Sequence, residues 1–191
     1  MKNQKSKREA LADPSRLKPW DSREDRSVQV VIETPKSSRN KYDFDQDLGV
    51  FELAKVLPSG MAFPYDFGFV PSTLADDGDP VDVLVLMDEP AFPGCVLKCR
   101  LIGIIEGEQV EKKRKKTRND RIVAIEQHNH SFADIKHIDD LGEDFLDELE
   151  EFFVNYHRML GKKYRILGAH GPGRAQRCIE AGRKALSSKK R

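Results

Sequence analysis

Apolar residues alternate with polar ones, or form short β-branched runs, along most of the first two thirds of the chain. This two-residue period is typical of β-strands, whose side chains point alternately to opposite faces. In segment 28–33, Val28, Val30 and Ile32 share one face. We expect further strands at 41–44, 50–56, 81–87, 95–105 with a bulge at Gly103, 121–126 and 164–167, and a structured loop at the Gly- and Pro-rich segment 63–69.

The period changes near the carboxyl end, where apolar residues recur at steps of three and four. This pattern predicts a helix that Asp139 or Asp140 caps and Gly161 ends. A second, basic helix is expected from residue 174 to about 187. The predicted fold class is mainly β, of the α+β type, with a small barrel removing the strand edges. The residues that define the first helix are Leu141, Phe145, Leu149, Phe152, Tyr156 and Met159.

A chain of 191 residues suits one domain with short extensions. Residues 1–26 show no sustained apolar period, so we expect a basic N-terminal arm that Trp20 anchors. Residues 27–170 form the predicted domain, and residues 171–191 a basic C-terminal helix and tail.

The net charge of +1 hides an uneven distribution. Segments 1–26, 111–121 and 174–191 carry +3, +5 and +6, which leaves −13 on the remainder. An acidic body gives no general support for nucleic-acid binding, and we expect no nucleic-acid partner. It suits a site that collects divalent cations.

The location is expected to be cytoplasmic, without a membrane partner. No apolar stretch approaches the roughly 18 residues of a membrane span, and no apolar segment follows the charged first ten residues. Three cysteines, an odd number, indicate free thiols in a reducing compartment.

The most informative segment is Asp-Asp-Gly-Asp-Pro-Val-Asp at 76–82. Asp77, Asp79 and Asp82 bring three carboxylates together just before a predicted buried strand. Hard oxygen ligands of this kind suit Mg²⁺, with Mn²⁺ as an alternative. An acidic turn that merely caps a strand is the competing interpretation.

This segment, followed by Val-Leu-Val-Leu, resembles the signature of family I soluble inorganic pyrophosphatases. The similarity extends over roughly residues 28–164, through the segments at 31–33, 41–43, 63–69, 93–103, 137–141 and 152–156. The chain is thus identified as a divergent member. The resemblance implies an OB-like five-stranded β-barrel with flanking helices, a homo-oligomer, divalent metals, and hydrolysis of pyrophosphate to two phosphates.

The resemblance also implies roles for individual residues. Asp79 is the candidate to hold the attacking water and accept its proton. The phosphoryl groups would be held by Lys41, Lys55, Arg121 and Tyr156, and the metal ions by Glu33, Asp77, Asp79, Asp82 and Asp120. Tyr156 also lies on the apolar stripe of its predicted helix, where packing is the competing role.

Several positions depart from the family pattern. After the long strand, the family has two more metal-binding carboxylates and a Lys, which Arg121 replaces. Asn119 falls where one carboxylate belongs, with Asp120 beside it, and a basic residue near Arg114 falls where the other belongs. The second metal cluster is therefore altered. The remaining departures are Lys55 for Arg, Phe63 and Phe67 for Tyr, Asp43 for Glu, and His157 for Lys.

Two alternatives to a pyrophosphatase remain open at this point. One is a phosphohydrolase for another phosphoanhydride, and the other is an OB-like binding module with weakened catalysis. The basic run 112–116 is expected in a protruding hairpin loop near the mouth of the site, where it would attract anionic substrate. It has no aromatic residues interleaved, which argues against single-stranded nucleic acid.

Overall fold

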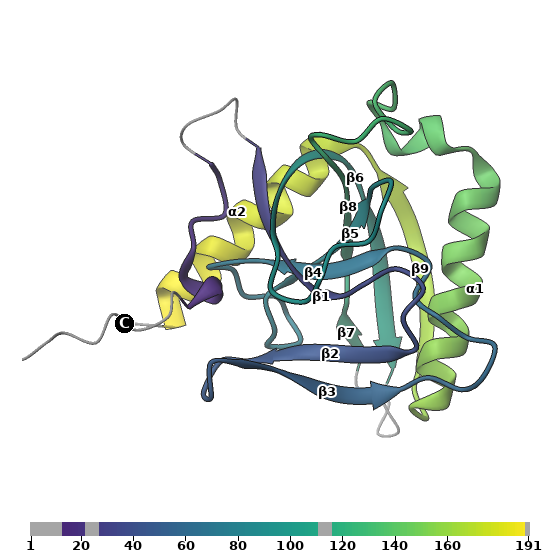
Figure 1. Cartoon of the computed structure of the whole chain (residues 1–191), viewed down its shortest axis with the longest axis horizontal. Coiled ribbons are helices and arrows are strands. Elements are labelled where there is room, and N and C mark those ends of the chain that lie inside the picture. Colours follow the sequence, from purple (N-terminus) through teal and green to yellow (C-terminus); the bar gives the residue numbers. More distant parts are fainter. Residues whose placement is uncertain (1–12, 22–26, 111–115, 190–191) are drawn as a thin grey trace, which may run out of the picture.

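The computed structural model describes residues 13–21, 27–110 and 116–189. Five strands close into a ring in the order β1, β4, β5, β8, β6, and β6 pairs back with β1 (Figure 1). Neighbours are antiparallel except for the parallel pair β5 and β8. Closure leaves these strands without a free edge. The predicted ring of five strands with a C-terminal helix is confirmed. The strands are β1 (Val28–Thr34), β4 (Asp66–Val70), β5 (Val81–Leu86), β6 (Val96–Val110) and β8 (Arg121–Glu126).

The other elements surround this ring. A separate hairpin is formed by β2 (Asn40–Asp45) and β3 (Val50–Val56), while β7 (Lys116–Arg118) and β9 (Lys163–His170) pair with β6. Helix α1 packs against β9, and α2 packs against β6 (Figure 1). The helical elements are η1 (Pro14–Arg16), η2 (Ile138–Leu141), α1 (Glu143–Met159) and α2 (Pro172–Lys189).

Strand β5 is buried on both faces and joins two apolar clusters. Leu84 and Leu86 pack with residues of α1, whereas Val83 and Val85 pack with residues of α2. The two-residue alternation of a strand produces this division. The buried strand fixes the residues at its start, where the acidic segment lies.

The expected strands are present, and β6 and β9 are longer than predicted. The register of β6 against β8 shifts between Leu101 and Gly103, which confirms the bulge. The loop expected at 63–69 is wrong in its second half, because β4 begins at Asp66. Gly68 explains the difference: a Cβ there would collide with the carbonyl oxygen of Val31, so glycine allows β1 and β4 to pair closely.

The expected helix cap is also wrong. Helix α1 follows Gly142, which provides no side-chain cap. Asp140 instead forms a capping box with His137 at the start of η2. The two elements are separate because Gly142, with a φ of 80°, turns the chain between them.

Near the amino end, the indole Nε1 of Trp20 donates a 2.8 Å hydrogen bond to Glu180 on α2. Among the described helices, none has the length and apolar character needed to cross a membrane.

Candidate active site

A cavity of about 350 Å³ opens between the β2–β3 hairpin and the start of β5. Four of the predicted site residues line it together. They come from three different parts of the fold: β1, β2, and the segment made of the loop before β5 and the start of β5. These four are Glu33, Lys41, Asp79 and Asp82, and the other lining residues are Asp43, Phe44, Gln46, Phe69, Gly78 and Pro80.

Lys41 and Glu33 form the basic and acidic sides of one wall. Burial favours the neutral amine of Lys41, but the ion pair with Asp43 outweighs it and raises the pKa of Lys41. Glu33 accepts a 2.9 Å hydrogen bond from the backbone N–H of Phe44. Burial nevertheless raises the pKa of Glu33 to about 8, against that hydrogen bond and the charge of Lys41.

The acidic segment forms the facing wall. Burial raises the pKa of Asp82 to about 7; the guanidinium of Arg121 opposes this shift and Asp77 adds to it. Burial also raises the pKa of Asp77, whose carboxylate accepts a 3.3 Å hydrogen bond from the N–H of Asp79. Asp77 thus folds back on its own loop, while Asp79 and Asp82 face the cavity.

Lys55 and Tyr156 lie beside this group. Lys55 is the cross-strand partner of Lys41, and its ammonium lies 5.7 Å from the ring centre of Tyr156. Partial burial and the charge of Lys41 lower the pKa of Lys55. Tyr156 is 6% exposed and packs against Phe63 and Phe152, so it has a structural role. Burial raises the pKa of its phenol, and the nearby charge of Lys41 opposes this shift.

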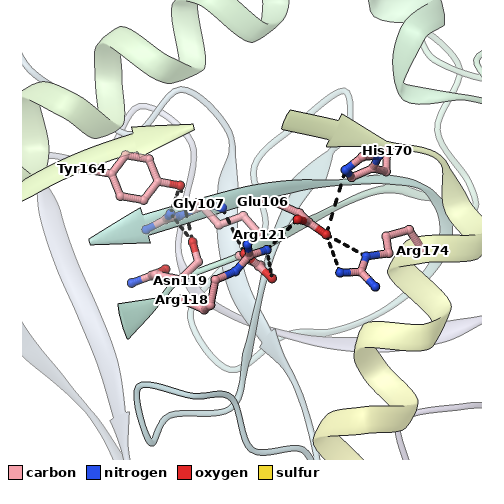
Figure 2. A network of polar contacts seen from close by, with 9 residues as sticks. Glu106, Gly107, Arg118, Asn119, Arg121, Tyr164, His170 and Arg174 are labelled. Atoms are coloured by element: carbon pink, nitrogen blue, oxygen red, sulfur yellow. Dashed lines mark hydrogen bonds and ion pairs between the residues drawn. The ribbon is translucent and has the colours of Figure 1, made fainter. Parts of the chain in front are cut away.

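Arg121 is 3% exposed and lies behind the acidic wall. Its guanidinium stacks 3.8 Å from the ring centre of Phe153 and donates to the hydroxyl of Tyr164 at 2.7 Å and to the carbonyl of Asn119 at 3.2 Å (Figure 2). Its Nε has no hydrogen-bond partner among the described residues. A buried donor left in this state costs about 1–3 kcal/mol, which favours a ligand atom as its partner.

The structure does not bring Asp120 to the other predicted metal ligands. Its carboxylate accepts from Arg118 and from the N–H of Gly107, and it lines a different cavity against α2. Arg121 begins β8, whereas Asp120 precedes the strand and is held by these contacts on the side of α2. Arg114 lies outside the described residues, as does most of the basic run, apart from Lys116, which pairs with Glu108 at 3.3 Å.

Two contributors were not singled out from the sequence. Tyr164 holds Arg121 in place, and Gln109 lies beside Asn119. Tyr164 was expected only as a strand residue. The alternation of β9, which places an aromatic residue inward near a buried cation, is the signal that could have identified it.

The oxygen atoms that line the cavity are of the type that binds a divalent cation. Carboxylate oxygens are the ligands that Mg²⁺ and Mn²⁺ prefer, and Glu33, Asp79 and Asp82 present them to one space. Within the described part of the chain, no three acidic, histidine or cysteine side chains already converge as a complete ligand group. Ligation would therefore draw these side chains together.

Comparison with known proteins identifies the family. The family model of inorganic pyrophosphatases matches residues 30–187. An inorganic pyrophosphatase from Synechocystis is 43% identical over 145 residues, which are 74% of this chain and 80% of that protein. The chain therefore belongs to the inorganic pyrophosphatase family.

Solved structures agree with this assignment. The crystal structure of inorganic pyrophosphatase from Thermus thermophilus superposes with a TM-score of 0.82 at 32% identity, covering 92% of this chain and 99% of that one. The inorganic pyrophosphatase from Helicobacter pylori gives a TM-score of 0.76 at 33% identity, covering 84% and 94%.

Proposed function

We propose that this chain hydrolyses inorganic pyrophosphate to two phosphates with the help of divalent cations. The observation that carries the proposal is the cavity that Lys41 lines together with Glu33, Asp79 and Asp82. A cation for phosphate and a set of carboxylates for metal ions are the two components that this reaction needs. Membership in the family supports the same substrate.

The carboxylates of Glu33, Asp79 and Asp82 would hold the cations, with Asp77 adjacent. When bound, such cations neutralise phosphate oxygens and acidify water. Mg²⁺ is the expected cation, and Mn²⁺ has the same ligand preference.

Proton transfer and phosphoryl binding are assigned to side chains of the chain itself. Asp79 lies exposed at the mouth of the acidic loop, where it can accept the proton of the attacking water. Lys41 holds a phosphoryl group from the opposite wall, and its pairing with Asp43 keeps it protonated. Lys55 and Tyr156 would bind the second phosphoryl group, while Arg121 would contribute positive charge from behind Asp82.

A cytoplasmic location and a homo-oligomeric state stay predictions. Sedimentation of the purified chain would test the second.

The function is tested by measuring phosphate release from pyrophosphate and from ATP, with and without Mg²⁺. We expect two phosphates per pyrophosphate, dependence on the cation, and little release from ATP. Faster cleavage of ATP would assign the site to another phosphoanhydride. Binding of nucleic acid without hydrolysis of either substrate would favour the binding module.

A further inference from the structure

Buried polar groups meet where β6, β7 and β8 approach the acidic wall. The amide of Asn119 donates to the Oε1 of Gln109 at 3.4 Å, and Gln109 is 7% exposed. The backbone carbonyl of Asn119 accepts from Arg121 and from Tyr164 (Figure 2). We call the group of Gln109, Asn119, Arg121 and Tyr164 the amide–guanidinium corner.

The family resemblance places one carboxylate of a second metal-binding pair at position 119, where the corner has the neutral amide of Asn119, and the other near Arg114, outside the described residues. The described carboxylates nearest in the sequence are engaged elsewhere. Glu106 binds Arg118 and Arg174, each at 2.7 Å (Figure 2). Glu108 binds Lys116 and Arg165 at 3.3 and 3.1 Å. Asp120 shares Arg118 with Glu106.

The corner also holds a permanent positive charge. A guanidinium stays protonated in proteins, whereas the amine of a lysine can lose its proton when buried. Arg121 is the register partner of Asp82 across the parallel strands, so this charge lies on the side of the acidic wall. A divalent cation in the corner would meet a fixed cation and neutral amides, so it does not fit there.

Two polar atoms of the corner have no partner among the described residues: the Nε of Arg121 and the Oδ1 of Asn119. One is a charged donor and the other a neutral acceptor. Anionic oxygen, not metal, is the natural partner of the donor.

We propose that the amide–guanidinium corner binds no divalent cation, and that the guanidinium of Arg121 supplies the positive charge at this end of the site. Among the described residues, divalent ions then bind at the carboxylates of the cavity. The proposal deepens the proposed pyrophosphatase function, because it concerns the number of cations that the chain's own residues hold at the site.

The test is the number of Mn²⁺ ions bound per chain, measured from the electron paramagnetic resonance signal of free Mn²⁺ in a titration without substrate. The wild type is compared with Gln109→Glu/Asn119→Asp, which introduces two neighbouring carboxylates of the same shape as the amides. We expect the double variant to bind about one Mn²⁺ more per chain than the wild type, since two neighbouring carboxylates form a ligand pair. Gln127→Glu, at an exposed amide, serves as the matched control and should bind the wild-type number.

A second variant, Asn119→Leu, removes the amide oxygen without adding charge. Asn119→Leu should leave the number of bound Mn²⁺ unchanged. Equal numbers in the wild type and the double variant, or loss of an ion in Asn119→Leu, would overturn the proposal. If the double variant does not fold, as judged by circular dichroism, Asn119→Asp alone takes its place. The measurement is independent of hydrolysis, so a chain without pyrophosphatase activity that gains one ion in the variant would refute the proposed function alone.

Discussion

Asp82 on β5 and Arg121 on β8 are register partners across the single parallel strand pair of the ring. Their side chains therefore leave the sheet on the same face, with the guanidinium behind the carboxylate. The pairing opposes the rise in the pKa of Asp82 that burial causes, yet burial prevails and the value is about 7. Burial therefore favours the neutral acid of Asp82, and a bound divalent cation would favour its carboxylate.

Replacement of Asp79 tests the proton acceptor. Asp79→Asn keeps the size of the side chain but removes its basicity, so turnover should fall by at least about 10²-fold while the protein stays folded. The control is Asp76→Asn, at an exposed carboxylate of the same loop, which should change turnover by less than about twofold. Both are measured as phosphate release across a Mg²⁺ titration. Near-wild-type turnover of Asp79→Asn at every concentration would remove Asp79 from this role.

Lys41 is predicted to be the principal phosphate-binding cation of the cavity. Lys41→Gln removes a charge-assisted hydrogen bond of about 1.5–3 kcal/mol, so kcat/KM should fall by roughly 10- to 10²-fold. Lys36→Gln is a matched control, because the Lys36 ammonium lies 6.0 Å from the ring centre of Tyr65 and the residue does not line the cavity. The two variants are compared in steady-state kinetics at one ionic strength. Equal losses in both would mean that general charge, and not the position of Lys41, matters.

Glu33, Lys41, Asp79 and Asp82 could be named as site residues because the short motifs that contain them resemble those of a known family. For the acidic segment alone, strand alternation and the Gly-Asp-Pro turn also indicate the directions of the side chains. Arg121 was predicted through the same resemblance, and its register with Asp82 explains its direction in the structure.

Asp120 could not be placed from residue type alone. Its side chain lies on the face opposite Arg121, and the partner that holds it, Arg118, is shared with Glu106, which also binds Arg174 from α2. Such a network depends on where α2 docks, which no local pattern encodes. Strand β4 could not be predicted either, because its aromatic and Gly/Pro-rich composition favours a loop. Only its pairing with β1 and β5 makes it a strand.

Gly107 is predicted to be indispensable for the position of Arg121. A Cβ on Gly107 would overlap the hydroxyl of Tyr164 and approach the carbonyl oxygen of Asn119 to 2.8 Å. Gly107→Ala should therefore lower the free energy of unfolding by about 1–3 kcal/mol and reduce turnover, because the groups that hold Arg121 must shift.

The matched control for Gly107 is Gly168→Ala on β9, where the added methyl meets nothing closer than 3.6 Å. It should change the free energy of unfolding by less than about 0.5 kcal/mol. Urea denaturation of the two variants measures the difference. Equal stability would show that the sheet accommodates the methyl and that Tyr164 does not depend on this glycine.

His157 is predicted to make the fold sensitive to acid. It is 2% exposed, its ring stacks on Tyr164 with centroids 4.5 Å apart, and its Nδ1 lies 2.8 Å from the carbonyl oxygen of Phe153. Burial, together with the nearby charge of Arg121, lowers the pKa of His157 to about 4. The folded chain therefore keeps the imidazole neutral under conditions in which the unfolded chain protonates it.

Because the unfolded state binds the extra proton, stability should be lost as the pH falls from about 6.5 toward 4. The shift corresponds to at most about 3 kcal/mol in the free energy of unfolding. His157→Gln should remove this dependence of stability on pH. The free energy of unfolding of the variant should therefore rise relative to that of the wild type as the pH falls. His128→Gln, at an exposed imidazole, is the control and should follow the wild type. Urea denaturation at pH 7.5, 6.0 and 4.5 measures the three curves, and a constant offset between His157→Gln and the wild type at all three values would contradict a buried neutral histidine.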